Sequence, residues 1–113
     1  MSLPQTYPVE VEGVGNFVFR RRTYADRAKV ANRTLAILGG VPEHPYLLDE
    51  ASKIAELELL IVEAPSGWDI ATLDPLDDED VAQMARVHGR FAEEETRFRG
   101  AFKAARGGRG PAT

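Results

Sequence analysis

Four polar side chains fall on the apolar faces that the sequence pattern predicts, and they are the residues best placed to do chemistry. They are Arg21, Glu58, His88 and Glu95. Burying any one of them alone is expensive, so each needs a polar partner or a ligand. A histidine and two carboxylates together can bind a metal ion, or one of the buried carboxylates can act as a base of raised pKa. A metal-binding or enzymatic domain centred on Glu58, His88 and Glu95 is therefore one hypothesis.

A structural interpretation of the same residues is favoured, because no glycine-rich pocket and no further ligand converges on them. In it, Arg21 and Glu58 form a buried ion pair between an N-terminal hairpin and the second helix. His88 and Glu95 then point inward, toward the rim of the core or a subunit partner. We accordingly expect a protein that is not an enzyme and uses no cofactor or metal.

Other motifs of catalysis or ligand binding are weak. The chain has two histidines, no cysteine and no Gly-x-Ser-x-Gly elbow, which argues against nucleophilic catalysis. Gly13-Val14-Gly15 lacks the third glycine and the lysine of a phosphate-binding loop. The acidic run Asp77–Asp80 does not match a cation-binding loop and suits the first turn of a helix. His44 lies between two prolines and is expected to be a solvated loop residue.

A basic segment from Arg20 to Arg33 lies near aromatic residues, a combination typical of nucleic-acid binding. The whole chain carries a net charge of −4, however, and Glu10 and Glu12 are placed to neutralise part of the segment. A nucleic-acid-binding regulator is therefore a second alternative, and nucleic acid is not the expected partner.

Charge is strongly segmented along the 113 residues. Residues 16–35 carry +5, residues 36–80 carry −11 and residues 81–113 carry +4. Such a pattern serves pairing between elements of one chain or complementary contact between copies. Without cysteine, a leader pattern or an apolar run near 18 residues, a cytoplasmic setting without membrane contact is expected.

Hydrophobic periodicity predicts a single α+β domain over residues 1–104, followed by a flexible tail over 105–113. We expect an N-terminal β-hairpin over about 7–22, then helices over about 24–38, 46–63 and 76–104. The hairpin should have a three-residue loop with Gly15 at positive φ, which sets Val11 opposite Phe17 and Val9 opposite Phe19.

The first and third predicted helices have recognisable apolar stripes. In the first, Tyr24, Ala28, Ala31, Leu35 and Leu38 share the face expected to be buried, opposite Asp26, Lys29 and Arg33. In the third, the stripe ends in Phe98 and Phe102. A helix of that length should overhang a compact core, which would leave both phenylalanines exposed.

Two runs carry a resemblance to a known family: Gly15 to Thr23 (GNFVFRRRT) and Ala64 to Asp69 (APSGWD). They look like runs in small proteins of bacteriophage and prophage tail-morphogenesis clusters, and the chain resembles tail assembly chaperones over about residues 9–99. The resemblance implies a non-enzymatic factor that binds another phage structural protein.

The leading hypothesis is a protein-interaction or assembly factor that self-associates, as a homodimer, and docks on a partner protein. The expected interaction surface consists of Phe98, Phe102, Arg20 and Arg22, with the hairpin edge as a second place where another chain could add.

Overall fold

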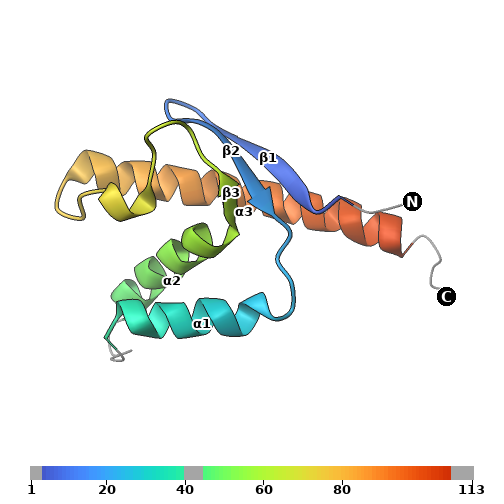
Figure 1. Cartoon of the computed structure of the whole chain (residues 1–113), viewed down its shortest axis with the longest axis horizontal. Helices are drawn as coiled ribbons and strands as arrows, with labels where there is room; N and C mark the ends of the chain where they lie inside the picture. Colours follow the sequence, from blue (N-terminus) through green and yellow to red (C-terminus); the bar gives the residue numbers. More distant parts are fainter. Residues whose placement is uncertain (1–3, 40–44, 108–113) are drawn as a thin grey trace.

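A computed structural model describes residues 4–39 and 45–107, which form an α+β fold (Figure 1). Three antiparallel strands lie in the order β1-β2-β3, and they are Thr6–Val11, Gly15–Arg20 and Ile61–Glu63. The helices are α1 (Asp26–Ile37), α2 (Pro45–Leu60) and α3 (Asp78–Arg106), with a 3-10 turn, η1 (Ile70–Thr72), before α3. The predicted hairpin followed by three helices, the last one long, is confirmed.

The α3 helix runs two residues beyond the predicted 76–104 at its C-terminal end and begins two residues later. Its N-cap is Asp77, whose carboxylate accepts a hydrogen bond from the Asp80 N–H at 3.2 Å. Ala105 and Arg106, expected in a tail, therefore belong to the helix. His44 and residues 108–113 lie outside the described residues.

The C-terminal end of the predicted second helix is wrong. The helix stops at Leu60, and the next three residues, Ile61–Glu63, form β3, which pairs antiparallel with β2. Two successive β-branched residues, Ile61 and Val62, favour an extended backbone. Pairing with β2 also satisfies backbone groups that would otherwise lie at an open edge of the sheet.

The predicted hairpin register is wrong by two residues, although the predicted buried face is right. Val9 lies opposite Phe17 and Val11 opposite Gly15. The loop comprises residues 12–14, and both glycines have positive φ, 79° at Gly13 and 139° at Gly15. A shift of two leaves the same side chains on the same face, because side chains alternate along a strand.

The core lies between the inner face of the sheet, the end of α2 and the middle of α3. It consists of Tyr7, Val9, Val11, Phe17, Phe19, Leu57, Leu60, Met84, Val87 and Phe91. The Phe19 ring stacks on the Phe91 ring with 4.6 Å between centroids, and Trp68 meets Phe17 edge-on at 4.9 Å. Trp68 is fixed by its Nε1–H, which donates to Gln83 at 2.8 Å.

The predicted orientation of the first helix is also wrong. In α1 the buried residues are Asp26, Val30 and Thr34, whereas Tyr24 and Leu35 are exposed. Figure 1 shows α1 packed alongside α2, below the level of α3 and the sheet. Because only one neighbouring helix covers α1, only a narrow face is buried, and Asp26 fixes which face that is.

Within residues 4–39 and 45–107, no helix is both long and apolar enough to cross a membrane.

Candidate functional site

A large groove lies where the start of β1 and the segment between β2 and α1 meet the C-terminal part of α3. Its volume is about 850 Å³. Two carboxylates, Glu56 and Glu95, and six cationic side chains line it. The cations are Arg21, Arg22, Arg27, Arg99, Lys103 and Arg106. We call it the basic groove.

The apolar floor of the basic groove is a row of aromatic rings. Tyr7 stacks on Phe98 with 4.5 Å between ring centroids, and Phe102 follows at 5.9 Å from Phe98. The Arg21 guanidinium lies 4.9 Å from the centre of the Phe102 ring, a cation–π contact, while its Nε donates a hydrogen bond to Gln5. The groove therefore offers apolar area and positive charge side by side.

Several cations of the basic groove have no carboxylate partner among the residues that the structure describes. Arg99 and Lys103 make no ion pair within the part of the chain that the structure describes, and both are exposed. The Arg27 guanidinium makes a cation–π contact with the Tyr24 ring and donates a hydrogen bond to the Tyr24 hydroxyl. Positive charge that is not neutralised by a carboxylate of residues 4–39 and 45–107 is positioned to attract an anionic group of a ligand.

Within the described part of the chain, one buried polar atom in the basic groove lacks a hydrogen-bond partner. The Tyr7 hydroxyl makes no hydrogen bond among residues 4–39 and 45–107, and Tyr7 is only 6% exposed. Burial, together with the negative charge of Glu95, raises the pKa of the Tyr7 phenol, so the group remains a hydrogen-bond donor at neutral pH. An unpaired buried donor is costly, and an acceptor that reaches the groove floor would satisfy it.

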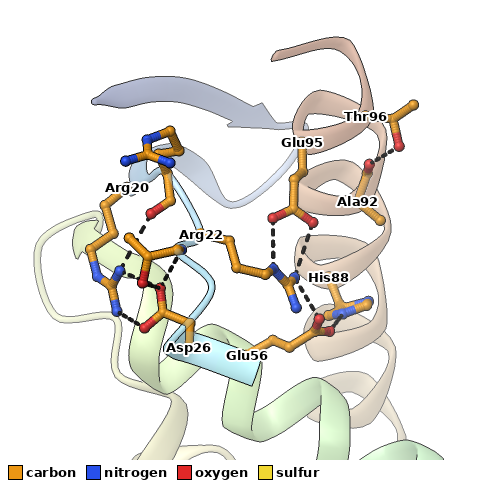
Figure 2. Close-up of polar contacts among 10 residues, drawn as sticks. Arg20, Arg22, Asp26, Glu56, His88, Ala92, Glu95 and Thr96 are labelled. Carbon is orange, nitrogen blue, oxygen red and sulfur yellow. Dashed lines mark hydrogen bonds and ion pairs between the residues drawn. The ribbon is translucent and has the colours of Figure 1, made fainter. Parts of the chain in front are cut away.

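Beneath the basic groove, four residues form a continuous polar network (Figure 2). Arg22 binds Glu95 through Nε at 2.9 Å and Nη2 at 3.0 Å, and its Nη2 lies 2.6 Å from the Glu56 carboxylate. Glu56 also meets His88 Nε2 at 2.7 Å. The network links the β2–α1 segment to both α2 and α3, so it holds one wall of the groove in place.

Paired charges shift the pKa values inside this network. Burial alone would raise the pKa of Glu56, but the hydrogen bonds with His88 and Arg22 outweigh it and lower that pKa. Burial acts to lower the pKa of Arg22, and its bonds to Glu95 and Glu56 raise it overall. The ionised forms of Glu56 and Arg22 are thus favoured, so the contact between them is a pairing of opposite charges.

The predicted buried pair of Arg21 and Glu58 is wrong. Arg21 donates from Nε to Gln5 at 3.2 Å, whereas Glu58 lies in an exposed ion pair with Arg33, 2.7 Å from its Nε. Two residues along a helix rotate a side chain by about 200°. Glu56 therefore points to the network, and Glu58 points to α1 on the other side of α2.

The same rotation removes the hypothesis of a site built from Glu58, His88 and Glu95. His88 and Glu95 are both partly buried and point inward to the network, but Glu58 is not with them. Among residues 4–39 and 45–107, no group of three metal-ligating side chains lies close enough together to hold an ion.

The predicted interaction surface is partly occupied within the chain. Arg22 belongs to the network, and Arg20 binds Asp26. Phe98 lies under Tyr7, and Phe102 lies under Arg21. The length of the helix predicted that both phenylalanines would be exposed beyond the core, but each is covered by another side chain of the chain. Both remain half-buried in the basic groove, where a ligand could contact them.

Sequence reasoning missed Glu56 and the Tyr7 hydroxyl. The apolar pattern of the second helix pointed to Glu58 as its inward-facing acid, so Glu56, two residues earlier on the same helix, was not singled out. Tyr7 was read as an ordinary hairpin residue. A buried tyrosine at the first inward position of a strand, next to a basic segment, was the available signal.

Comparison with known proteins gave no match for this chain. No family model matches the chain, and no curated protein and no solved structure is significantly similar to it. The function must therefore be argued from the site itself.

Proposed function

We propose that this protein is a non-enzymatic interaction or assembly factor that binds an acidic segment of a partner protein in the basic groove. One observation carries the proposal: unpaired cations and half-buried aromatic rings line the same groove. The cations, without a carboxylate partner among the described residues, are Arg99 and Lys103, and the rings are those of Phe98 and Phe102. An acidic segment with an apolar side chain matches both features, because it offers carboxylates and apolar area.

Nucleic acid is a weaker fit to the same groove. Arg20, Arg22 and Arg33, three arginines of the predicted basic segment, are each paired with a carboxylate of this chain. The segment is therefore not a continuous positive face, and phosphate binding gains its affinity from several unpaired cations in a row. The net charge of −4 also opposes a polyanion.

The resemblance to tail assembly chaperones belongs to the same class of function, since such a factor binds another structural protein. A tail protein with an exposed acidic segment is accordingly the first natural partner to test.

The test is a titration with a fluorescent peptide of alternating glutamate and leucine, read by anisotropy. The wild-type chain is expected to bind it, and the double variant Arg99→Glu, Lys103→Glu to bind it at least about tenfold more weakly. Lys53→Glu on α2, outside the groove, is the matched control and should bind like the wild type. Tighter binding of a single-stranded oligonucleotide than of the peptide, or equal binding by the double variant, would overturn the proposal.

A further inference from the structure

An exposed leucine lies at the centre of a rigid acidic turn, at the end of α3 opposite the basic groove. Leu76 is 91% exposed. The residues around it, 74–80, include five acids, and we call this segment the acidic turn. Figure 1 shows that it precedes the first turn of α3, far from the end of the helix beside which β1 begins.

The acidic turn is held in one conformation by its own hydrogen bonds. Asp74 accepts from the Leu76 N–H at 2.9 Å, and the Asp74 N–H donates to Asp80 at 2.8 Å. Asp78 and Glu79 are exposed on the first turn of α3. A segment that is already ordered loses little conformational entropy on binding, which favours it as a ligand.

We infer that the partner segment for the basic groove is the acidic turn of a second copy of this chain, with Leu76 on the aromatic floor and the surrounding carboxylates at the cations. This inference rests on the proposed function and names its occupant. The two surfaces match in apolar area and in charge. An apolar side chain with acidic neighbours would lie on an apolar floor with basic neighbours. The buried Tyr7 hydroxyl gains a carboxylate acceptor when the side chains that cover it move aside on binding.

The contact has to be between copies. Leu76 precedes α3, and Phe102 lies 24 residues beyond its first residue, Asp78, a separation of about 36 Å at 1.5 Å per helical residue. Since α3 is a continuous helix, the acidic turn of one chain cannot reach the groove of the same chain. This contact would occur both in a closed dimer and in an open, head-to-tail oligomer.

The outer edge of the hairpin is a poorer place for a second copy. The backbone N–H of Arg21 donates to the Gln5 carbonyl. The backbone N–H and C=O groups of the odd-numbered β1 residues therefore point toward β2, and those of the even-numbered residues point to the outer edge of the sheet. Outward-facing Pro8 has no N–H, and the outward Glu10 carbonyl already accepts from Arg90 Nε at 3.0 Å. Proline and a covering arginine both block strand addition.

Two variants separate the two halves of the contact. Leu76→Asp removes the apolar side chain and keeps the groove, whereas Lys103→Glu alters the groove and keeps the acidic turn. Both positions are exposed, so circular dichroism and the melting temperature should match the wild type. Light scattering coupled to size exclusion, from low micromolar to millimolar concentration, measures the association of each chain alone and of their equimolar mixture.

The wild type is expected to associate, and each variant alone to associate about tenfold or more weakly, because burial of a leucine is lost or a charge pair becomes repulsive. The mixture should regain association, since one chain keeps the turn and the other keeps the groove. A monomeric wild type at every concentration, variants that associate normally, or a mixture without recovery would each overturn the inference. If the wild type is monomeric but still binds the glutamate–leucine peptide, the inference fails while the proposed function stands.

Discussion

Arg20 and Asp26 form a two-pronged ion pair at the point where β2 passes into α1. Arg20 Nη1 lies 2.8 Å from one carboxylate oxygen and Nη2 lies 3.0 Å from the other. Asp26 also accepts from the Thr23 N–H at 2.7 Å and the Thr23 hydroxyl at 3.0 Å. Although only 1% exposed, the carboxylate thus has a donor on each oxygen, which explains how an acid can begin a helix on its buried face.

Asp26→Asn is expected to destabilise the fold by roughly 2–3 kcal/mol, below the cost for a wholly buried pair because Arg20 is one-third exposed. The amide cannot accept from Arg20 at both positions, so a charged donor is left without its acceptor. Urea denaturation followed by Trp68 fluorescence measures the loss. Asp49→Asn, in the exposed pair with Lys53, is the control and should leave the midpoint within error; an equal loss in both variants would contradict the assignment.

The stability of the wild type should also fall with acid through this pair. The Arg20 hydrogen bonds hold the pKa of Asp26 well below its ordinary value of 3.8, even though burial acts to raise it. A lowered folded-state pKa gives stability that is complete above the unfolded-state value and is lost as the pH falls through the folded-state one. Between about pH 5 and pH 2, the wild type should therefore lose more stability than Asp26→Asn. If the free energy of unfolding of the wild type and of Asp26→Asn fell equally with pH, Asp26 would not be the group responsible.

Glu56 and Glu58 make a matched test of the polar network, because they lie two residues apart on the same helix. Glu56→Gln weakens the contacts to both His88 and Arg22 beneath the groove and should cost about 1–3 kcal/mol. Glu58→Gln affects only the exposed pair with Arg33 and should cost much less. Denaturant midpoints of the two variants decide the order, and a larger loss for Glu58→Gln would restore the sequence-based assignment of the buried acid.

The hairpin loop offers a second matched pair in Gly13 and Gly15. Both have positive φ, so alanine is strained at either position, by about 1–2 kcal/mol. A Cβ at Gly15 would lie 2.7 Å from Pro65 Cγ, whereas a Cβ at Gly13 meets no atom within 4 Å. Gly15→Ala should therefore lower the melting temperature more than Gly13→Ala, and equal shifts would mean that the contact with Pro65 is not limiting.

The fold class could be predicted from the sequence because alternation and helical stripes average over many residues. Hairpin register could not, since a slip of two keeps Val9 and Phe17 on the same buried face. The end of α2 was missed because Ile61 and Val62 continue its apolar run, and only the presence of β2 as a neighbour turns them into a strand.

The site was less predictable than the fold, because its parts come from distant segments. That Arg22, His88 and Glu95 lie together depends on how β2, α2 and α3 cross, which no local pattern encodes. In α1, helical periodicity places Asp26 opposite the apolar stripe, but the ion pair with Arg20 allows the Asp26 side of the helix to be buried. Single charges thus decided which faces were buried where apolar periodicity was ambiguous.

Tyr7→Phe separates the stability of the free protein from the function of the basic groove. The hydroxyl is buried and has no partner in the described part of the chain, so its removal should leave the free protein equally stable or more stable, by about 1 kcal/mol. Binding of an acidic segment should nevertheless weaken about tenfold, because a hydrogen bond to a carboxylate is lost in the complex. Urea denaturation and the glutamate–leucine peptide titration give the two values on the same samples.

Tyr46→Phe is the control for this substitution, because Tyr46 is 74% exposed at the start of α2 and lies outside the groove. It should change neither stability nor peptide affinity. A stabilised Tyr7→Phe that binds the peptide as tightly as the wild type would show that the ligand does not reach the groove floor. A destabilised Tyr7→Phe would show that the hydroxyl already contributes to the free fold, and the argument for an acceptor supplied by the partner would then fail.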